Sequence, residues 1–380
     1  MRTCIRNCRL ISPGYELDNA TIEMDGGVIT RIYADGEMPE GTDDGYDASG
    51  RMAVPGFIDI HTHGASGYDF SEAGPEGIAE ILKCKLKEGV TTVIPTTLTL
   101  PESALADALK RISVQMCKPE FVKIPGVHLE GPYLNKEWSG AQNPAYLRLP
   151  DISEVLRLDN LARVLTVTFA VELDGGMAFI GELLSRGIIP SCGHSGASYV
   201  QFSEARRRGL RKLTHFCNQM SKLNHREIGL VGGGLIDDGA MVEIICDRLH
   251  LSPDMVSMVF KFKPLESILL ITDSVSASWM GDGTFKLAGL DVVLRNGEAR
   301  LASNGALAGS SLKFNEALRN AHEISGIPLK SLIRTTSFNQ ALLLGLENVG
   351  KIEAGRRADI AILDKDFSVS QVFVDGIPKL

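Results

Sequence analysis

Short apolar runs alternate with longer amphipathic segments in the central part of the 380-residue chain. Pro75–Lys87 has the apolar spacing of a helix, and a glycine and the β-branched run Val90–Ile94 follow it. Two further segments, Ala178–Arg186 and Tyr199–Arg208, continue in the same order, with a helix, a glycine and then a strand. This pattern predicts repeated strand–helix units.

Eight candidate strands start near residues 58, 91, 124, 165, 188, 211, 242 and 268. The intervals of 23 to 41 residues leave room for one crossover helix each. Parallel strands joined in this way form either an open doubly wound sheet or a closed barrel. Eight strands over roughly 220 residues favour a (β/α)₈ TIM-type barrel. The first strand is not followed by the GxGxxG motif of dinucleotide-binding folds.

Both ends of the chain have the short alternating runs of β-structure. Near the N-terminus, Thr21–Met24 and Val28–Ile32 flank the turn sequence Asp-Gly-Gly, which predicts a hairpin. We expect the two ends to build one small β-sandwich domain around the inserted barrel. The expected parts are residues 1–53 plus 345–380 for the small domain, and residues 54–344 for the barrel, with a β insertion near residues 283–302.

The composition is that of an ordinary soluble globular protein, with 44% hydrophobic and 23% charged residues. A net charge of −8 argues against a nucleic-acid or anionic membrane partner. No apolar run approaches the roughly 20 residues that span a bilayer. The seven cysteines are scattered and form no CxxC pair, which favours reduced thiols in a cytoplasmic protein without a signal peptide.

A His-x-His pair follows the apolar run that starts the predicted barrel. Residues i and i+2 of a strand point to the same side, so His61 and His63 can direct both imidazoles at one metal ion. The pair alone is a weak signal, because two histidines with no ligand role fit it equally well.

Further candidate ligands follow other predicted barrel strands. Glu130 ends the third strand, His194 the fifth, His215 the sixth and Asp273 the eighth. Active sites of these barrels lie at the C-terminal rim of the strands, so all these side chains are expected at one rim. Imidazole and carboxylate ligands suit zinc, iron or a similar divalent ion. A carboxylate such as Asp273 at the end of a buried strand needs such a partner.

These residues lie in motifs that together resemble one family. The motifs are Pro55-Gly56-Phe57-Ile58-Asp59, His128-Leu129-Glu130-Gly131-Pro132, Gly193-His194-Ser195, Thr214-His215, Asn218 with Met220, Arg226-Glu227, Leu249-His250, Thr272-Asp273 and Gly309-Ser310-Ser311. Over nearly its whole length the chain resembles the N-acetylglucosamine-6-phosphate deacetylases of the amidohydrolase superfamily.

The resemblance implies a centre of one or two divalent ions, which zinc, iron, manganese or cobalt could supply. The main ion would share Glu130 with a second ion held by His61 and His63. Asp273 would be the catalytic general base and acid. The implied metal ligands are His61, His63, Glu130, His194, His215 and Asp273.

The resemblance also implies a phosphosugar substrate, N-acetylglucosamine 6-phosphate, hydrolysed to glucosamine 6-phosphate and acetate. Arg226 would reach the phosphate group from the partner subunit of a homodimer. The other implied substrate-binding residues are Ala141, Gln142, Asn218, Gln219, Arg248, His250, Leu307, Ala308 and Gly309.

Three of these positions depart from the family pattern. Gln142 replaces a usual histidine, Gln219 an alanine and Arg248 a glycine. All three are expected at the substrate, whereas the metal ligands are intact. A different N-acyl substrate, such as N-acetylgalactosamine 6-phosphate or an acidic N-acyl compound, is therefore an open alternative. An inactive relative that serves as a binding or structural partner is the other alternative, and the intact ligand set argues against it.

Overall fold

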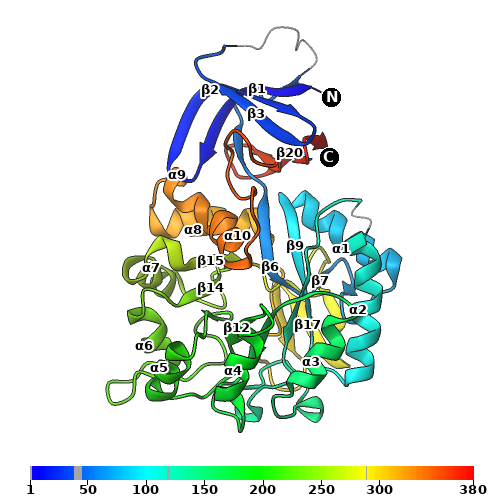
Figure 1. Cartoon of the computed structure of the whole chain (residues 1–380), viewed down its shortest axis with the longest axis vertical. Helices are drawn as coiled ribbons and strands as arrows, with labels where there is room; N and C mark the ends of the chain where they lie inside the picture. Colours follow the sequence, from blue (N-terminus) through cyan, green and yellow to red (C-terminus); the bar gives the residue numbers. More distant parts are fainter. Residues whose placement is uncertain (1, 38–44, 118–119, 288) are drawn as a thin grey trace.

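The computed structural model describes residues 2–37, 45–117, 120–287 and 289–380. Met1 and residues 38–44 of the expected N-terminal β region lie outside the described residues. An eight-stranded parallel sheet fills the middle of the chain, with neighbouring strands in sequence order (Figure 1). Its strands are β6 (Phe57–Thr62), β9 (Val90–Thr97), β10 (Val127–Glu130), β11 (Val164–Phe169), β12 (Ile189–Cys192), β13 (Lys212–Leu213), β14 (Met241–Ile245) and β15 (Ile268–Ile271).

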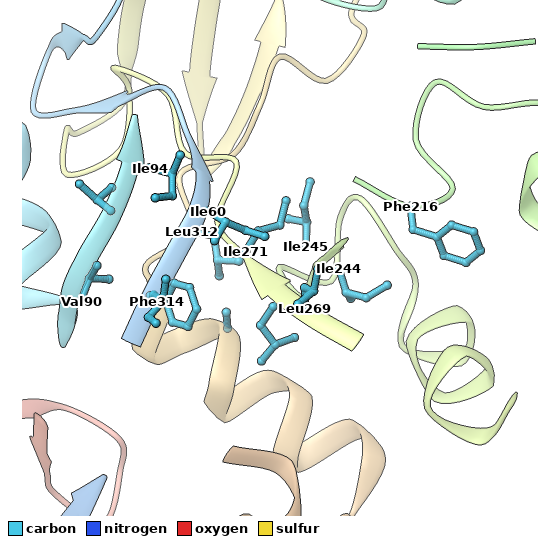
Figure 2. Close-up of a cluster of buried hydrophobic side chains, with 14 of the residues drawn as sticks. Ile60, Val90, Ile94, Phe216, Ile244, Ile245, Leu269, Ile271, Leu312 and Phe314 are labelled. Carbon is cyan, nitrogen blue, oxygen red and sulfur yellow. The ribbon is translucent and has the colours of Figure 1, made fainter. Parts of the chain in front are cut away.

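The last strand returns to the first, as the predicted barrel requires. Just beyond β15, the backbone N–H of Asp273 donates to the carbonyl of His61 at 2.9 Å. Apolar side chains fill the base of the barrel, among them Ile60, Leu269 and Ile271 (Figure 2). Outside β6, the rings of Phe57 and Phe314 stack with centroids 5.1 Å apart. The strand ends thus rest on a tightly packed base.

Helices cover the outside of the barrel (Figure 1). They are α1 (Pro75–Lys87), α2 (Glu102–Cys117), α3 (Ile152–Asp159), α4 (Gly176–Leu184), α5 (Tyr199–Arg207), α6 (Gly229–Ile236), α7 (Pro253–Phe262) and α8 (Phe314–Ser325). A run of three glycines, at residues 232–234, lies inside α6. A Cβ on Gly233 would lie 2.6 Å from the Phe202 ring, and one on Gly234 2.4 Å from Phe216, so these positions require close packing. No helix of the described residues is long and apolar enough to cross a membrane.

Residues 329–344 form a helical segment that is broken in the middle. It forms α9 (Leu329–Leu332), a 3₁₀ turn (Ile333–Thr336) and α10 (Phe338–Leu344). The Thr335 and Thr336 hydroxyls donate to backbone carbonyls three residues earlier, at 2.8 and 2.7 Å. Such bonds compete with regular helical hydrogen bonding. In α10, Asn339 donates to the carbonyl of Ile268 at 2.8 Å, which fixes this helix beneath β15.

The two chain ends form a second sheet, at the top of Figure 1. Strand β5 pairs with β19 so that Ile360 lies opposite Pro55, and both β1 and β20 continue the same sheet. Its strands are β1 (Thr3–Ser12), β2 (Tyr15–Asp25), β3 (Val28–Tyr33), β4 (Tyr46–Asp47), β5 (Met52–Pro55), β19 (Ile360–Leu363), β20 (Val369–Val374) and β21 (Ile377–Pro378). Buried side chains from both ends, including Ile22 and Phe373, share one core.

Smaller β elements lie beyond the strand ends of the barrel. A short hairpin, β7 (Gly64–Ala65) and β8 (Tyr68–Asp69), follows the first barrel strand. After the eighth strand comes an antiparallel sheet of β16 (Gly283–Leu287), β17 (Leu290–Arg295) and β18 (Glu298–Leu301). The segment after β18 returns to the barrel, because the N–H of Ser310 donates to the carbonyl of Asp273 at 2.8 Å.

Candidate metal centre and its pocket

The six predicted ligands meet at the C-terminal ends of the barrel strands. Glu130 is the last residue of β10, whereas His194, His215 and Asp273 each lie two residues beyond a strand. These three residues have left-handed backbone angles, with φ of 49°, 31° and 50°. This conformation is costly for residues other than glycine and clusters at functional sites. Here it accompanies the turn that places each side chain over the barrel mouth.

A first group of ligand atoms comes from Glu130, His194 and His215. Glu130 Oε1 lies 3.2 Å from His194 Nε2 and 2.9 Å from His215 Nε2, and the two nitrogens are 3.0 Å apart. Ligand atoms about 2.1 Å from a shared ion lie roughly 3.0 to 3.4 Å from one another. The His194 Nδ1 atom is 2.8 Å from the carbonyl of Trp138, to which it donates, so Nε2 is free to act as a ligand.

A second group comes from His61, His63 and Asp273. Asp273 Oδ1 lies 3.4 Å from His61 Nε2 and 3.3 Å from His63 Nε2. The buried Nε2 atom of His61 has no hydrogen-bond partner among the described residues, a cost that a bound ion would remove. Glu130 lies between the groups, because its Oε1 is 3.5 Å from His61 Nε2 and its Oε2 is 3.2 Å from His63 Nε2.

Charge and burial favour a cation at this place. All six ligand side chains are buried. Burial would raise the pKa of Glu130, but the facing His61, followed by the hydrogen bonds of His194 and His215, holds that pKa well below its usual range. Burial would lower the pKa of His63, yet its bonds to Asp273 and Glu130 raise it well above the ordinary value. The carboxylates therefore stay ionised and attract positive charge, and this set of nitrogen and oxygen donors fits a divalent metal ion.

A pocket of about 280 Å³ opens over the ligands. This volume is close to the lower end of the range for small-ligand pockets, about 300 Å³. Seven predicted substrate-binding residues line it: Ala141, Gln142, Asn218, Gln219, His250, Leu307 and Gly309. The sequence interpretation missed Leu98, Val275 and Leu287, apolar residues without a chemical motif, which also line it. Among the described residues of its wall there is no Lys or Arg.

Three predicted residues lie elsewhere. Ala308 is fully buried, and Arg226 is exposed on a loop outside the pocket. Arg248 turns away from the pocket to α8, where it donates to Asn320 Oδ1 at 3.3 Å and Glu323 Oε2 at 2.5 Å. Its guanidinium therefore already has two partners on the protein, and the predicted substrate contact of Arg248 stays a prediction. Its φ of 68° is a left-handed backbone conformation that glycine adopts more readily than arginine.

Gln142 contacts a metal ligand. Its Oε1 accepts from the N–H of Thr99 at 2.8 Å, which leaves the amide nitrogen facing Glu130 Oε2 at 2.5 Å. Gln219 differs, because its side chain lines the pocket without a hydrogen bond to any described residue. The two glutamines that depart from the family pattern therefore have different surroundings: one holds Glu130, and the other is free to meet a ligand.

His250 is the one imidazole in the pocket wall that belongs to neither ligand group. Its Nδ1 lies 2.6 Å from Asp247 Oδ2. Burial lowers the pKa of His250, but the hydrogen bond and the charge of Asp247 outweigh it and raise that pKa. The carboxylate thus favours a charged ring with two N–H donors.

Two buried ion pairs near the ligands were not expected from the sequence. Glu243 in β14 pairs with Lys212 in β13, and Lys85 in α1 pairs with Asp59 and Glu88. Their signal was a charged residue inside an otherwise apolar run, as in Met-Val-Glu-Ile-Ile of β14. Glu243 contacts His61 and His215, and Lys85 contacts Thr272 and Ser274 on either side of Asp273.

Comparison with known proteins agrees with this geometry. The amidohydrolase family model matches residues 52–377. An N-acetylglucosamine-6-phosphate deacetylase of Lysinibacillus sphaericus is 33% identical over 375 residues, which are 98% of this chain and 96% of that protein. An N-acetylgalactosamine-6-phosphate deacetylase of Escherichia coli O157:H7 is 33% identical over 381 residues, 99% of each chain.

Solved structures of similar proteins share the whole fold. The N-acetylglucosamine-6-phosphate deacetylase of Thermotoga maritima superposes with a TM-score of 0.90 at 32% identity, covering 99% of both chains. A mutant of the Mycobacterium smegmatis enzyme has been solved in complex with N-acetyl-D-glucosamine-6-phosphate. It superposes with a TM-score of 0.93 at 29% identity, covering 100% of this chain and 99% of the mutant chain. The match of the family model and the similarity to these relatives, together with the barrel and its ligand groups, show that the chain belongs to the amidohydrolase family.

Proposed function

We propose that this chain removes the acetyl group from N-acetylglucosamine 6-phosphate and releases glucosamine 6-phosphate and acetate. The observation that carries the proposal is the convergence of two groups of metal-ligand atoms, one of which includes Asp273, beneath a small pocket at one end of the barrel. The relatives that match almost the whole chain at about the same identity support an amino-sugar phosphate as substrate.

The ligand groups would hold two divalent ions, one at Glu130, His194 and His215 and one at His61 and His63. When bound, such ions polarise a carbonyl oxygen and lower the pKa of a water molecule. Asp273 lies within 3.4 Å of both His61 and His63 Nε2, where its carboxylate can accept the proton of the attacking water. As the amide C–N bond breaks, Asp273 donates that proton to the departing amine nitrogen. The acetyl carbon keeps the water oxygen and leaves as acetate.

His250 is placed to stabilise negative charge on the amide oxygen. Asp247 holds Nδ1 and favours the protonated ring, so the pocket-facing imidazolium retains an N–H on Nε2. A positioned donor that meets charge developing in the transition state is among the largest catalytic contributions. His250 would therefore act together with Asp273, one on the oxygen and one on the nitrogen of the amide.

The phosphate group requires a cation that the described pocket wall does not contain. We propose that Arg226 of a partner subunit supplies it in a homodimer. The Arg226 side chain is exposed and forms no ion pair with a described residue. Nearby, Tyr199, Val200 and Leu223 expose 36%, 71% and 52% of their surface. An exposed apolar cluster beside a free arginine is typical of a protein interface.

A direct assay tests the proposal. Metal-loaded protein is mixed with N-acetylglucosamine 6-phosphate, its galactosamine epimer or unphosphorylated N-acetylglucosamine, and acetate and free amine are measured. We expect fast turnover of the glucosamine phosphate and a loss of at least about 100-fold without the phosphate, because binding energy from remote groups raises the rate. Preference for the epimer would favour the second candidate, which the Escherichia coli relative supports. No hydrolysis of either phosphosugar by metal-loaded protein would contradict the proposal.

A further inference from the structure

One buried carboxylate touches both groups of metal ligands. Glu243 Oε2 accepts a hydrogen bond from His61 Nδ1 at 2.9 Å and another from the backbone N–H of His215 at 3.1 Å. Its other oxygen, Oε1, pairs with the ammonium group of Lys212. The Glu243 side chain is 0% exposed and that of Lys212 1% exposed, so water reaches neither charge.

Stability alone does not explain this pair. Removing two charges from water has a large desolvation cost. A protein with an apolar pair of similar volume in place of a buried ion pair is often equally stable or more stable. The neighbours of Glu243 in β14, Val242 and Ile244, are apolar. A charged residue in such a strand therefore needs a role other than packing, and the contacts of Glu243 lie at the metal centre.

We propose that Glu243, with Lys212 as its counter-ion, is a positioning residue for a second metal ion at His61, His63 and Asp273. The carboxylate fixes the proton of His61 on Nδ1, and the ring then presents the lone pair of Nε2 to the ion. The unpartnered and buried Nε2 atom of His61 is the independent observation that points to this ion. The inference rests on the proposed metal-dependent function and extends it to residues outside the ligand set.

Neighbouring contacts restrict His61 to this orientation. The ring of His128 lies 4.8 Å from that of His61 between centroids, at 78°, and is itself held by Thr168 Oγ1 at 2.7 Å. Because Lys212 already balances the charge of Glu243, His61 has to supply only a hydrogen bond. The imidazole can therefore act as a neutral ligand at the centre of the barrel.

The test counts metal ions in Glu243→Gln protein. Wild-type, variant and control proteins are equilibrated with Zn²⁺, and the bound ions are measured by mass spectrometry and by calorimetric titration. Wild-type protein is expected to bind two ions per chain. The variant should bind one ion with nearly unchanged affinity and the second about 10- to 100-fold more weakly. An amide neither fixes the proton of His61 on Nδ1 nor balances the charge of Lys212.

A matched control separates positioning from loss of a buried ion pair. Asp359→Asn removes a carboxylate that is also buried and paired with a lysine, Lys123, but contacts no metal ligand. It should keep both ions at wild-type affinity. If Glu243→Gln does not fold, the double variant Glu243→Leu with Lys212→Met replaces the pair by apolar side chains, and it should fold and bind one ion.

Two ions bound at wild-type affinity by either Glu243 variant would overturn the proposal, and so would fewer than two ions in the wild-type protein. Metal counts need no substrate, so this test does not depend on the proposed deacetylase activity. A wild-type protein that binds two ions but hydrolyses neither phosphosugar would contradict the deacetylase function and leave the role of Glu243 intact.

Discussion

The two groups of metal ligands are held in place by different kinds of contact. In the first group, His194 is fixed by the carbonyl of Trp138, and Glu130 by the amide of Gln142. Both of these side-chain supports are neutral, although the backbone N–H of His215 also donates to Glu243. In the second group, His61 is fixed by a carboxylate that is paired with Lys212.

Asp273, also in the second group, is supported by charge as well. Lys85 donates to Thr272 Oγ1 at 3.1 Å and to Ser274 Oγ at 2.7 Å, on either side of Asp273. The same lysine pairs with Asp59 and Glu88. The carbonyl of Ser274 also accepts the backbone N–H of His63 at 2.8 Å, so one buried lysine restrains two ligands.

This difference indicates how each group responds to mutation. Neutral hydrogen bonds contribute modestly, and their loss weakens a ligand without leaving a charge behind. A buried ion pair that loses one partner leaves an uncompensated charge, which costs several kcal/mol. The first group should therefore keep its ion under most substitutions of its surroundings, and the second should lose its ion after single substitutions at a distance.

The largest effect on turnover is expected for Asp273→Asn. An amide cannot accept the proton of water, so kcat should fall by about 10² to 10⁴, the usual contribution of a general acid–base group. The first group contains no Asp273 atom, and its ion should remain. Steady-state kinetics and a metal count measure the two effects together. A variant with kcat within tenfold of the wild type would exclude Asp273 as the proton-transfer group.

A smaller effect is expected for Gln142→Leu, which removes the neutral support of Glu130. Loss of such an outer contact should weaken binding of the first ion about tenfold, as measured by competition with a zinc chelator. Gln219→Leu is the matched control, because Gln219 lines the same pocket without contacting a ligand. It should change KM and leave the metal affinity alone. Equal metal affinities for the two variants would show that Gln142 does not position Glu130.

A change in pH dependence is expected for Asp247→Asn. Burial lowers the pKa of His250, and Asp247 raises it above the ordinary value. Without that carboxylate, burial prevails and the ring loses its proton at lower pH. The fall of kcat on the alkaline side should therefore begin at lower pH in the variant. An alkaline limb that stays in place would mean that the charge of His250 does not serve the reaction.

The smallest effect is expected for Arg248→Gly. The side chain points to Asn320 and Glu323, outside the pocket wall, so kcat/KM should change less than about twofold. Glycine also relieves the left-handed backbone at this position, which offsets the lost surface contacts in the free energy of unfolding. A switch of substrate preference in this variant would restore a substrate role for Arg248.

The sequence predicted the barrel well because strand, glycine and helix signals repeat in phase along it. Its largest shift was at β10, which begins at Val127 although the apolar run suggests a start near residue 124. Lys123 forms an isolated bridge to Thr92, but Pro125 has no N–H for a central strand, and the continuous strand starts beyond it. Ligands at strand ends were predictable for the same reason, since barrel geometry brings those ends together.

Side chains on the rim loops were not predictable in this way. The direction of Arg248 depends on α8, more than 70 residues later in the chain, and that of Gln142 depends on a backbone N–H at Thr99. The pair of Lys212 and Glu243 arises only when β13 and β14 lie side by side. Such contacts between distant segments have no local pattern.

The most direct test of the two-group account is a crystal structure of the protein grown with zinc, with data collected on both sides of the zinc absorption edge. The account predicts two anomalous peaks about 3.5 to 4 Å apart. One should lie beside Glu130, His194 and His215, and the other beside His61 and His63. A single peak at the first group, with the second empty at saturating zinc, would contradict it.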